Sequence, residues 1–165
     1  MPLERTVEKV REFFPGEILE VGPTRADPAL VIRKDRCHEI LQFLKEDPEL
    51  SFDMMVDLCG VDYLKFETQP RFELVYHLYS LTHNHRLRVR VKVSEDSMSL
   101  PTVIDLWKTA DWFEREAYDM FGFRFEGHPN LKRLLLFEGF EGHPLRKDYP
   151  IEKRQKIPLP EETQT

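Results

Sequence analysis

The fold is decided by two neighbouring stretches, Arg71-Phe-Glu-Leu-Val-Tyr-His-Leu-Tyr-Ser-Leu81 and His85-Arg-Leu-Arg-Val-Arg-Val-Lys-Val93. The first is rich in aromatic and aliphatic residues, and the second alternates apolar with basic residues, so each predicts a β-strand. The polar residues Thr82-His83-Asn84 between them predict a turn. The two stretches therefore predict an antiparallel hairpin whose second strand points four apolar side chains at the core: Leu87, Val89, Val91 and Val93.

The opposite side of the second strand carries a basic row, defined here as Arg86, Arg88, Arg90 and Lys92. One interpretation is a solvated face or a charged sheet edge that resists strand-to-strand aggregation. A second is a docking surface for an acidic partner, and a third is nucleic-acid binding. The sequence leaves these alternatives open.

Helices and strands are also predicted on the N-terminal side of the hairpin. Residues 6–14 show helical spacing of apolar residues before Pro15-Gly16, and a second helix follows Asp35, which is predicted to cap it. Between the two helices, residues 18–21 and 29–33 predict short strands joined around a Gly22-Pro23 turn. The second helix has a stripe of apolar residues that predicts a buried side: Cys37, Ile40, Leu41 and Leu44.

A further strand is predicted over Phe52–Cys59, because apolar and polar residues alternate there. Its predicted inward residues are Phe52, Met54, Val56 and Leu58. Along the sequence, predicted helices precede and follow several predicted strands. This order favours an α+β fold, a two-layer domain with a mostly antiparallel or mixed sheet flanked by helices. We expect this domain to span residues 1–122.

The segment Asp111–Phe121 predicts a helix that ends at Gly122, which supplies a left-handed terminus. Phe113, Ala117, Met120 and Phe121 share its apolar side. Asp111 and Asp119 each lie four residues from Arg115, so the spacing predicts ion pairs with it. Glu114 and Glu116 flank the apolar side, and we interpret them as salt-bridge partners in preference to a catalytic acid and base.

Residues 123–165, the strap, contain many glycines and prolines together with aromatic residues and leucines. The pentapeptide Phe-Glu-Gly-His-Pro occurs twice there, at 125–129 and 140–144. This composition predicts an ordered, extended, partner-binding segment whose final residues, from Ile151, are mobile without a neighbour. His128 and His143 are expected to order the loops or to contact a ligand.

Composition excludes several classes of function. The 165-residue chain has a formal net charge of −6, which disfavours nucleic-acid binding. Cys37 and Cys59 lie outside any Cys-x-x-Cys spacing, and no apolar run reaches the roughly 20 residues of a membrane span. Nucleotide-binding glycine loops and nucleophile motifs are also missing. A distant alternative is a small metal-dependent hydrolase that uses Glu73, His77, His83 and His85.

Three segments carry a resemblance to a known family: Glu114-Arg115-Glu116-x-x-Asp119-Met-Phe-Gly122; His128-Pro129 with Arg133-Leu-Leu; and Gly142-His143-Pro144-Leu-Arg146-Lys-Asp148-Tyr149-Pro150. In order and spacing they resemble the 30 kDa subunit of respiratory complex I, the NADH:quinone oxidoreductase. A looser resemblance extends through Phe52–Cys59, Gly60-Val-Asp-Tyr63 and the hairpin. The resemblance implies that these signature residues serve assembly.

The resemblance implies a non-redox, peripheral-arm subunit of a proton-pumping enzyme, with no catalytic, cofactor-binding or metal-binding residue on this chain. FMN and iron–sulfur clusters on partner subunits would carry electrons from NADH to quinone. The implied partners are chiefly the large hydrogenase-like and the small cluster-bearing subunits. The implied location is the cytoplasmic side of the inner membrane, or the matrix side in mitochondria, reached only through the complex. Related subunits of membrane-bound hydrogenases and ferredoxin- or F420-linked complexes remain an alternative.

Overall fold

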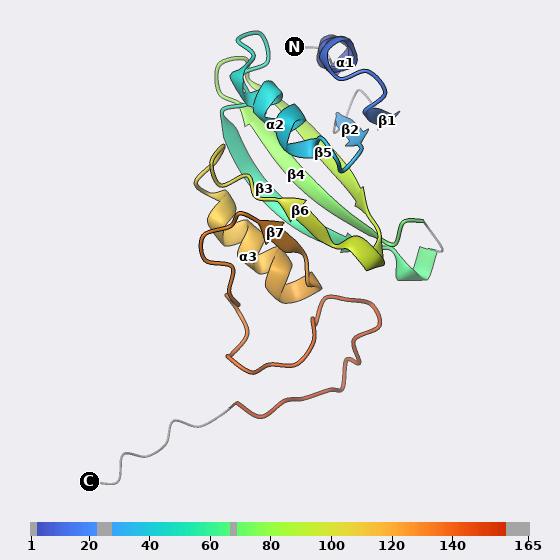
Figure 1. The fold of residues 1–165 in the computed structure, drawn as a ribbon, viewed down its shortest axis with the longest axis vertical. Coiled ribbons are helices and arrows are strands. Elements are labelled where there is room, and N and C mark those ends of the chain that lie inside the picture. The colour runs from blue at the N-terminus through green and yellow to red at the C-terminus, as the bar shows by residue number, and fades with distance from the viewer. Residues whose placement is uncertain (1–2, 23–27, 67–68, 158–165) are drawn as a thin grey trace, which may run out of the picture.

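The computed structural model describes residues 3–22, 28–66 and 69–157. A five-stranded mixed sheet in the order β1-β2-β5-β4-β3 forms its centre (Figure 1). The strands are β1 (Ile18–Val21), β2 (Ala29–Ile32), β3 (Met54–Asp62), β4 (Phe72–Ser80) and β5 (His85–Val93). All neighbours are antiparallel except β2 and β5, which are parallel. The predicted hairpin and the α+β fold class are both confirmed.

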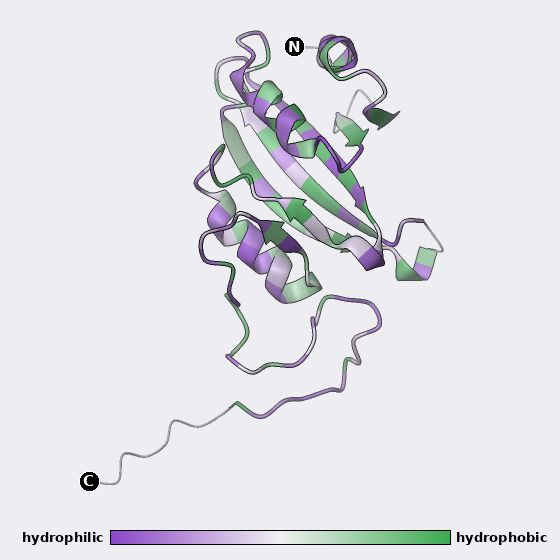
Figure 2. Ribbon diagram, viewed as in Figure 1, coloured by the Kyte–Doolittle hydropathy of each residue, from purple (hydrophilic) through white to green (hydrophobic). Residues whose placement is uncertain are grey.

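Three helices pack on one face of the sheet: α1 (Leu3–Phe13), α2 (Cys37–Glu46) and α3 (Ala110–Phe121). Apolar and polar residues alternate along β5, and Leu87, Val89, Val91 and Val93 all face the helices, as predicted (Figure 2). They join one core with the buried side of α2 and with aromatic side chains near the end of α3. Short 3-10 turns lie at Leu64–Phe66 and Glu95–Ser97.

The predicted facing of the Phe52–Cys59 strand is wrong at Met54 and Val56, although Phe52 and Leu58 are buried as predicted. The register between β3 and β4 shifts between Met55 and Asp57. An extra residue in one strand moves the side chains that precede it to the other face. Met55 is therefore buried together with Leu58, whereas Met54 and Val56, expected to face the core, are exposed.

The predicted Asp35 cap is also wrong. Arg36 occupies the cap position of α2, and no side chain bonds the free amides there. The apolar stripe of α2 is confirmed, because all four predicted residues are fully buried. Packing of that stripe therefore accounts for the helix better than a local capping interaction does.

A second, two-stranded parallel sheet was not predicted. It pairs β6 (Ser99–Pro101) with β7 (Arg124–Glu126), which lies inside the strap. Phe125 of β7 and the preceding Phe123 are buried in the core. The division of the chain after residue 122 stays a prediction. Pro23 of the predicted Gly22-Pro23 turn and the chain from residue 158 onward lie outside the described residues.

Candidate functional site

The signature residues converge where α3 ends and the strap folds back onto it. The last carbonyls of a helix lack partners within the helix. Here the strap supplies them: His143 Nδ1 lies 3.0 Å from the Asp119 carbonyl, the Leu145 amide donates to Met120, and Arg146 Nε donates to Phe121. Gly122 has φ +87°, so the left-handed helix end is confirmed. We call this region the strap anchor.

The Asp119 carboxylate is the centre of the strap anchor. Its Oδ2 accepts hydrogen bonds from the amides of Leu134, Leu135 and Leu136, at 2.8 to 3.0 Å. Its Oδ1 accepts from Arg133 Nη1 at 2.6 Å. The side chain is fully buried, so one carboxylate fixes four consecutive strap residues to α3.

Burial alone would raise the pKa of Asp119. The hydrogen bonds from the Leu136 amide, Arg133 and the neighbouring amides act against burial and leave the pKa below its ordinary value. The carboxylate is therefore charged at neutral pH. Its contribution to stability is present above the ordinary aspartate pKa and is lost as the pH falls below it.

Space around Gly122 is as restrictive as its backbone conformation. A Cβ built there would lie 2.8 Å from His143 Nε2 and 3.0 Å from Arg146 Nη2. Both side chains hold α3 carbonyls, so they cannot retreat without breaking those bonds. The absence of a side chain at this position allows the strap to approach the helix end.

The predicted pairing of Arg115 with Asp111 and Asp119 is not what the structure shows. Arg115 donates from Nε to the Lys132 carbonyl at 3.2 Å and from Nη2 to the Arg133 carbonyl at 3.4 Å, and it stacks on Trp112. Asp119 turns to Arg133. Helical spacing predicts only pairs within the helix, whereas Arg115 and Asp119 both bond to residues of the strap.

Arg71 makes a second link between the sheet and the strap, which sequence reasoning missed. Its guanidinium donates to both oxygens of Asp62, at 2.9 and 2.8 Å, and it also pairs with Glu95 and with Asp148 of the strap. Asp62 further accepts from the Lys147 amide. Burial opposes the charge on Asp62, yet these bonds lower its pKa to about 2. The sequence did not predict this role of Arg71, because the pattern there indicates only the first residue of a strand.

Glu114 is fully buried on α3, against the expectation of a salt-bridge partner on a flank. Its carboxylate accepts from Thr102 Oγ1 at 2.6 Å and from the Val103 amide at 2.7 Å. His128 Nε2 is 4.0 Å away, and His128 Nδ1 accepts from the Asn130 amide. Glu114 therefore ties the segment after β6 to α3. Burial raises its pKa from 4.5 to about 7, against those two hydrogen bonds.

Glu114→Gln is expected to flatten the dependence of stability on pH. A carboxyl whose pKa is raised by folding stabilises the fold fully below its unfolded pKa, and this contribution is lost as the pH rises through the folded pKa. Between about pH 4.5 and pH 7, wild type should lose up to about 3 kcal/mol of unfolding free energy from this group. Urea denaturation across that range measures it.

The matched control is Glu116→Gln, two residues along the same helix at an exposed position. It should keep the wild-type pH profile. Identical profiles for Glu114→Gln and wild type would contradict the assignment of a raised pKa to Glu114.

The remaining signature residues lie along the strap. Gly142 has φ +92°, and a Cβ there would lie 2.9 Å from the Tyr149 ring, which stacks on Phe140. Arg133 Nη2 donates to the Phe140 carbonyl at 2.7 Å, so it joins the two halves of the strap. Pro144 is half-buried, whereas Pro129 and Pro150 are exposed. The structure brings the signature together, while its role in partner binding stays a prediction.

The residues named for a hydrolase do not form one site. His85 packs edge-on against Phe52 on the helix-covered face, whereas Glu73 and His77 face the other side of the sheet. Glu73 is buried and engaged by Arg90 at 2.8 Å. Glu73 and His77 are four residues apart on β4, or about 13 Å along the strand. The alternation of side chains along the strands therefore places His85 on the face opposite Glu73 and His77.

Within the described part of the chain, one group has ligand atoms close enough for a metal ion: Asp57, Cys59 and His77 on the face away from the helices. Arg88 is the cross-strand neighbour of His77, and its charge acts on the Cys59 thiol. The positive charge of a neighbouring arginine opposes the binding of a metal cation beside it. We assign no metal to this group.

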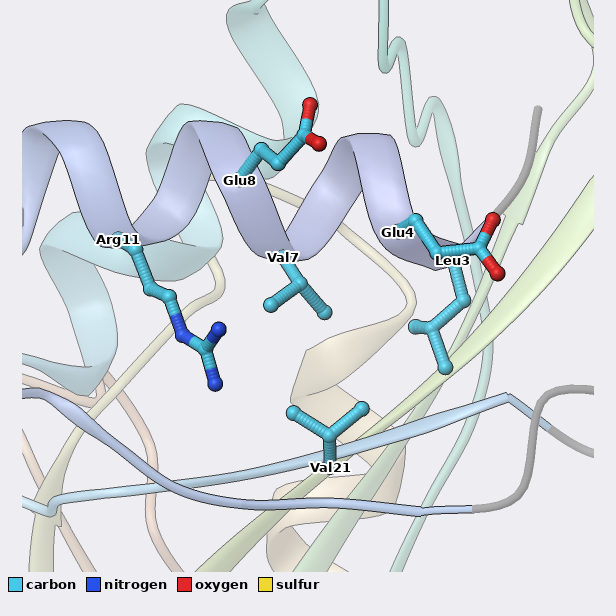
Figure 3. Close-up of a pocket in the computed structure, with 6 residues that line it drawn as sticks. All are labelled: Leu3, Glu4, Val7, Glu8, Arg11 and Val21. Carbon is cyan, nitrogen blue, oxygen red and sulfur yellow. The ribbon is translucent and has the colours of Figure 1, made fainter.

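A groove and a polar hollow lie apart from the sheet centre. A groove of about 350 Å³ separates α1 from the edge strand β1, and Leu3, Val7 and Val21 point into it (Figure 3). A polar hollow of about 560 Å³ borders the strap anchor, and its lining includes Arg124, Arg133 and Arg146 together with Glu95 and Asp96. No residue of the groove was predicted as a site.

The fold and the strap anchor define a class of protein, an α+β domain with a C-terminal strap fixed to it by buried charges and helix-end hydrogen bonds. Comparison with known proteins identifies the family within this class. The chain belongs to the family described as respiratory-chain NADH dehydrogenase, 30 kDa subunit, whose model matches residues 30–155.

Relatives of known name agree with this family. An NADH-quinone oxidoreductase C subunit of Rhizobium meliloti (strain 1021) is 46% identical over 138 residues, 84% of this chain and 74% of that protein. The C subunit of the same enzyme from Roseiflexus sp. (strain RS-1) is 46% identical over 145 residues, 88% of this chain and 82% of the relative. The homologues are therefore subunits of an oxidoreductase complex, complex I.

Solved structures share the fold. The trypsin-resistant fragment (1-134) of Nqo5 has a TM-score of 0.68 at 36% identity, covering 78% of this chain and 98% of the fragment. A chain of the membrane-bound sulfane sulfur reductase, an archaeal respiratory membrane complex, has a TM-score of 0.75 at 27% identity, covering 90% and 86%. In the segments that the structure describes, none of the helices has the length and apolar character needed to cross a membrane.

Proposed function

We propose that this chain is a non-redox scaffold subunit in the peripheral arm of a proton-pumping NADH:quinone oxidoreductase. The observation that carries the proposal is the strap anchor. Buried charges hold the strap against α3, while Leu135, Leu145 and Ile151 project from it with 62%, 48% and 100% of their surface exposed. Apolar side chains held out by an ordered segment are suited to burial against another subunit.

The energetics support an assembly role for the strap. An extended segment that orders only on binding loses conformational entropy at that moment, which weakens the complex. Here the strap is already ordered by contacts within its own chain. Asp119 and Arg115 bond to strap residues 132–136, and Arg71 pairs with Asp148. A preordered strap leaves more of the contact energy for the partner.

The remaining parts of the proposal follow from the family. The chain would contact chiefly the large hydrogenase-like and the small cluster-bearing subunits. FMN and iron–sulfur clusters on partner subunits would carry electrons from NADH to quinone, with no catalytic centre on this chain. Its place would be peripheral, on the cytoplasmic side of the inner membrane or the matrix side in mitochondria, through the complex alone.

A second candidate is the equivalent subunit of a related respiratory complex with another electron donor. The observation that favours it is the shared fold with a chain of the sulfane sulfur reductase, which covers 90% of this protein. Because the scaffold carries none of the proposed redox groups, the same fold suits complexes with different donors.

Purification of a tagged copy from its native cells separates the candidates. We expect the hydrogenase-like and the cluster-bearing subunits to be recovered together with a flavin-binding NADH subunit, identified by mass spectrometry. Recovery of the cluster-bearing neighbours with a hydrogenase-type or ferredoxin-linked module in place of the NADH subunit would favour the second candidate. Flavin or iron bound to the purified chain alone would contradict the scaffold proposal.

A further inference from the structure

The basic row lies at the centre of the sheet. β5 is flanked by β2 on one side and by β4 on the other. A row of charges resists aggregation when it lies on an edge strand, where free backbone groups invite pairing. Both edges of β5 are already paired, so the edge-protection interpretation of the basic row is wrong.

The basic row also lies on the face of the sheet opposite the helices. The apolar side chains of β2, β4 and β5 that enter the core come from the other face. On the face of the basic row, Ala29, Val31 and Val75 are at most 5% exposed without belonging to that core. Arg88 pairs in register with Ala29, and Arg90 with both valines, so the arginine stems cover a small apolar floor.

Among the described residues, basic side chains outnumber acidic ones on this face. Arg90 is matched by Glu73, to which it donates at 2.8 and 3.0 Å. Arg86 lies over the ring of Tyr79, its cross-strand neighbour, and Lys92 lies opposite Glu73, which Arg90 already engages. The other carboxylates that the described strands place on this face are Asp57 on β3 and Glu20 on β1, which pairs in register with Val31, so four basic residues meet three acidic ones. The face is therefore cationic on a protein whose formal net charge is −6.

On these observations, and resting on the proposed function, we infer that the helix-free face of the sheet is a docking surface for an acidic surface of a neighbouring protein subunit. Arginine over an apolar floor is typical of the centre of protein interfaces. The three strands of nine residues, β3, β4 and β5, offer roughly 14 Å by 30 Å, on the order of 400 Å², which is about half the area that one partner contributes to a standard interface. The basic row orients the acidic partner and excludes basic ones.

The alternative occupant, nucleic acid, is less well matched. Single-stranded binding surfaces combine cations with exposed aromatic platforms. On this face the Tyr79 ring is covered by Arg86, and the Tyr63 hydroxyl donates to Glu73 and accepts from Arg90. Glu73 and Asp57 on the same face also repel phosphate.

The test uses the full tagged chain, purified from native cells with its partners. Arg86→Glu with Lys92→Glu is expected to lower the recovery of at least one partner subunit about tenfold, because opposed like charges replace attraction. The matched control, Arg11→Glu with Lys108→Glu, makes the same change of charge at exposed positions elsewhere and should recover partners as wild type does. Circular dichroism melting checks that both variants fold.

A milder pair, Arg86→Gln with Lys92→Gln, covers the case in which charge reversal prevents folding, and it should show a smaller loss in the same direction. Partner recovery equal to wild type in these variants would overturn the inference while leaving the proposed function intact. Binding of duplex DNA that depends on the basic row would also overturn it. Recovery of no partner with the wild-type chain would overturn the proposed function itself.

Discussion

Asp119→Ala should detach the strap from α3 and lower the free energy of unfolding by about 3 kcal/mol, the range seen when one partner of a buried charge pair is removed. Removal of the carboxylate leaves Arg133 without its counter-ion and three backbone amides without an acceptor. Unsatisfied buried donors are costly, since they gave up water for the lost bond. Urea denaturation of the purified chain measures the change.

Limited trypsin digestion reports the strap separately from global stability. Lys132 and Arg133 lie in the anchored segment, so cleavage there should become rapid in Asp119→Ala. In the relative Nqo5, a trypsin-resistant fragment covers residues 1-134 of that protein, so digestion is informative in this family. The control is Asp96→Ala, at an exposed acidic position. Unfolding energy and cleavage rates equal to wild type in Asp119→Ala would contradict the central place of this carboxylate.

Gly60→Val is expected to destabilise the fold by about 3 kcal/mol through overpacking. Gly60 lies on β3 beneath the end of α3, and a Cβ there would lie 2.7 Å from the rings of both Phe121 and Phe123. These rings belong to the buried core, so neither is free to move aside. A thermal melt of the isolated chain measures the effect.

Cys59→Val is the control for that substitution. Cys59 is the preceding residue of β3 and faces away from the helices, so the same branched side chain there points away from the rings of Phe121 and Phe123. It should melt near the wild-type temperature. Equal melting of Gly60→Val and wild type would show that α3 does not pack on the strand as closely as described.

The sequence was most informative where a periodic pattern coincides with burial. The hairpin of β4 and β5 and the stripe of α2 follow from alternation and helical spacing, because their apolar residues all enter one core. The facing of β3 failed at Val56, since a bulge leaves no mark in an alternating pattern. β6 and β7 are three residues long and were missed, because so short a strand has no readable period.

The candidate site shows the same division. The signature residues were found as letters, and Gly122 was correctly placed at a left-handed helix end. The partners of Arg115 and Asp119 were not found, because they come from strap residues 14 to 18 positions away in the chain, beyond any helical spacing. Long-range partners of this kind depend on how the strap folds back, which spacing alone does not reveal.

Arg115→Ala tests the central claim most directly, since this arginine binds strap carbonyls and does not touch the Asp119 carboxylate. In native cells that carry the variant, we measure assembled complex by native gel electrophoresis and the NADH:quinone turnover of each assembled complex. Arg115→Lys, which retains the charge but loses the planar fork, is the conservative companion. A scaffold predicts less assembled complex with wild-type turnover per complex, whereas normal assembly with lost turnover would contradict it.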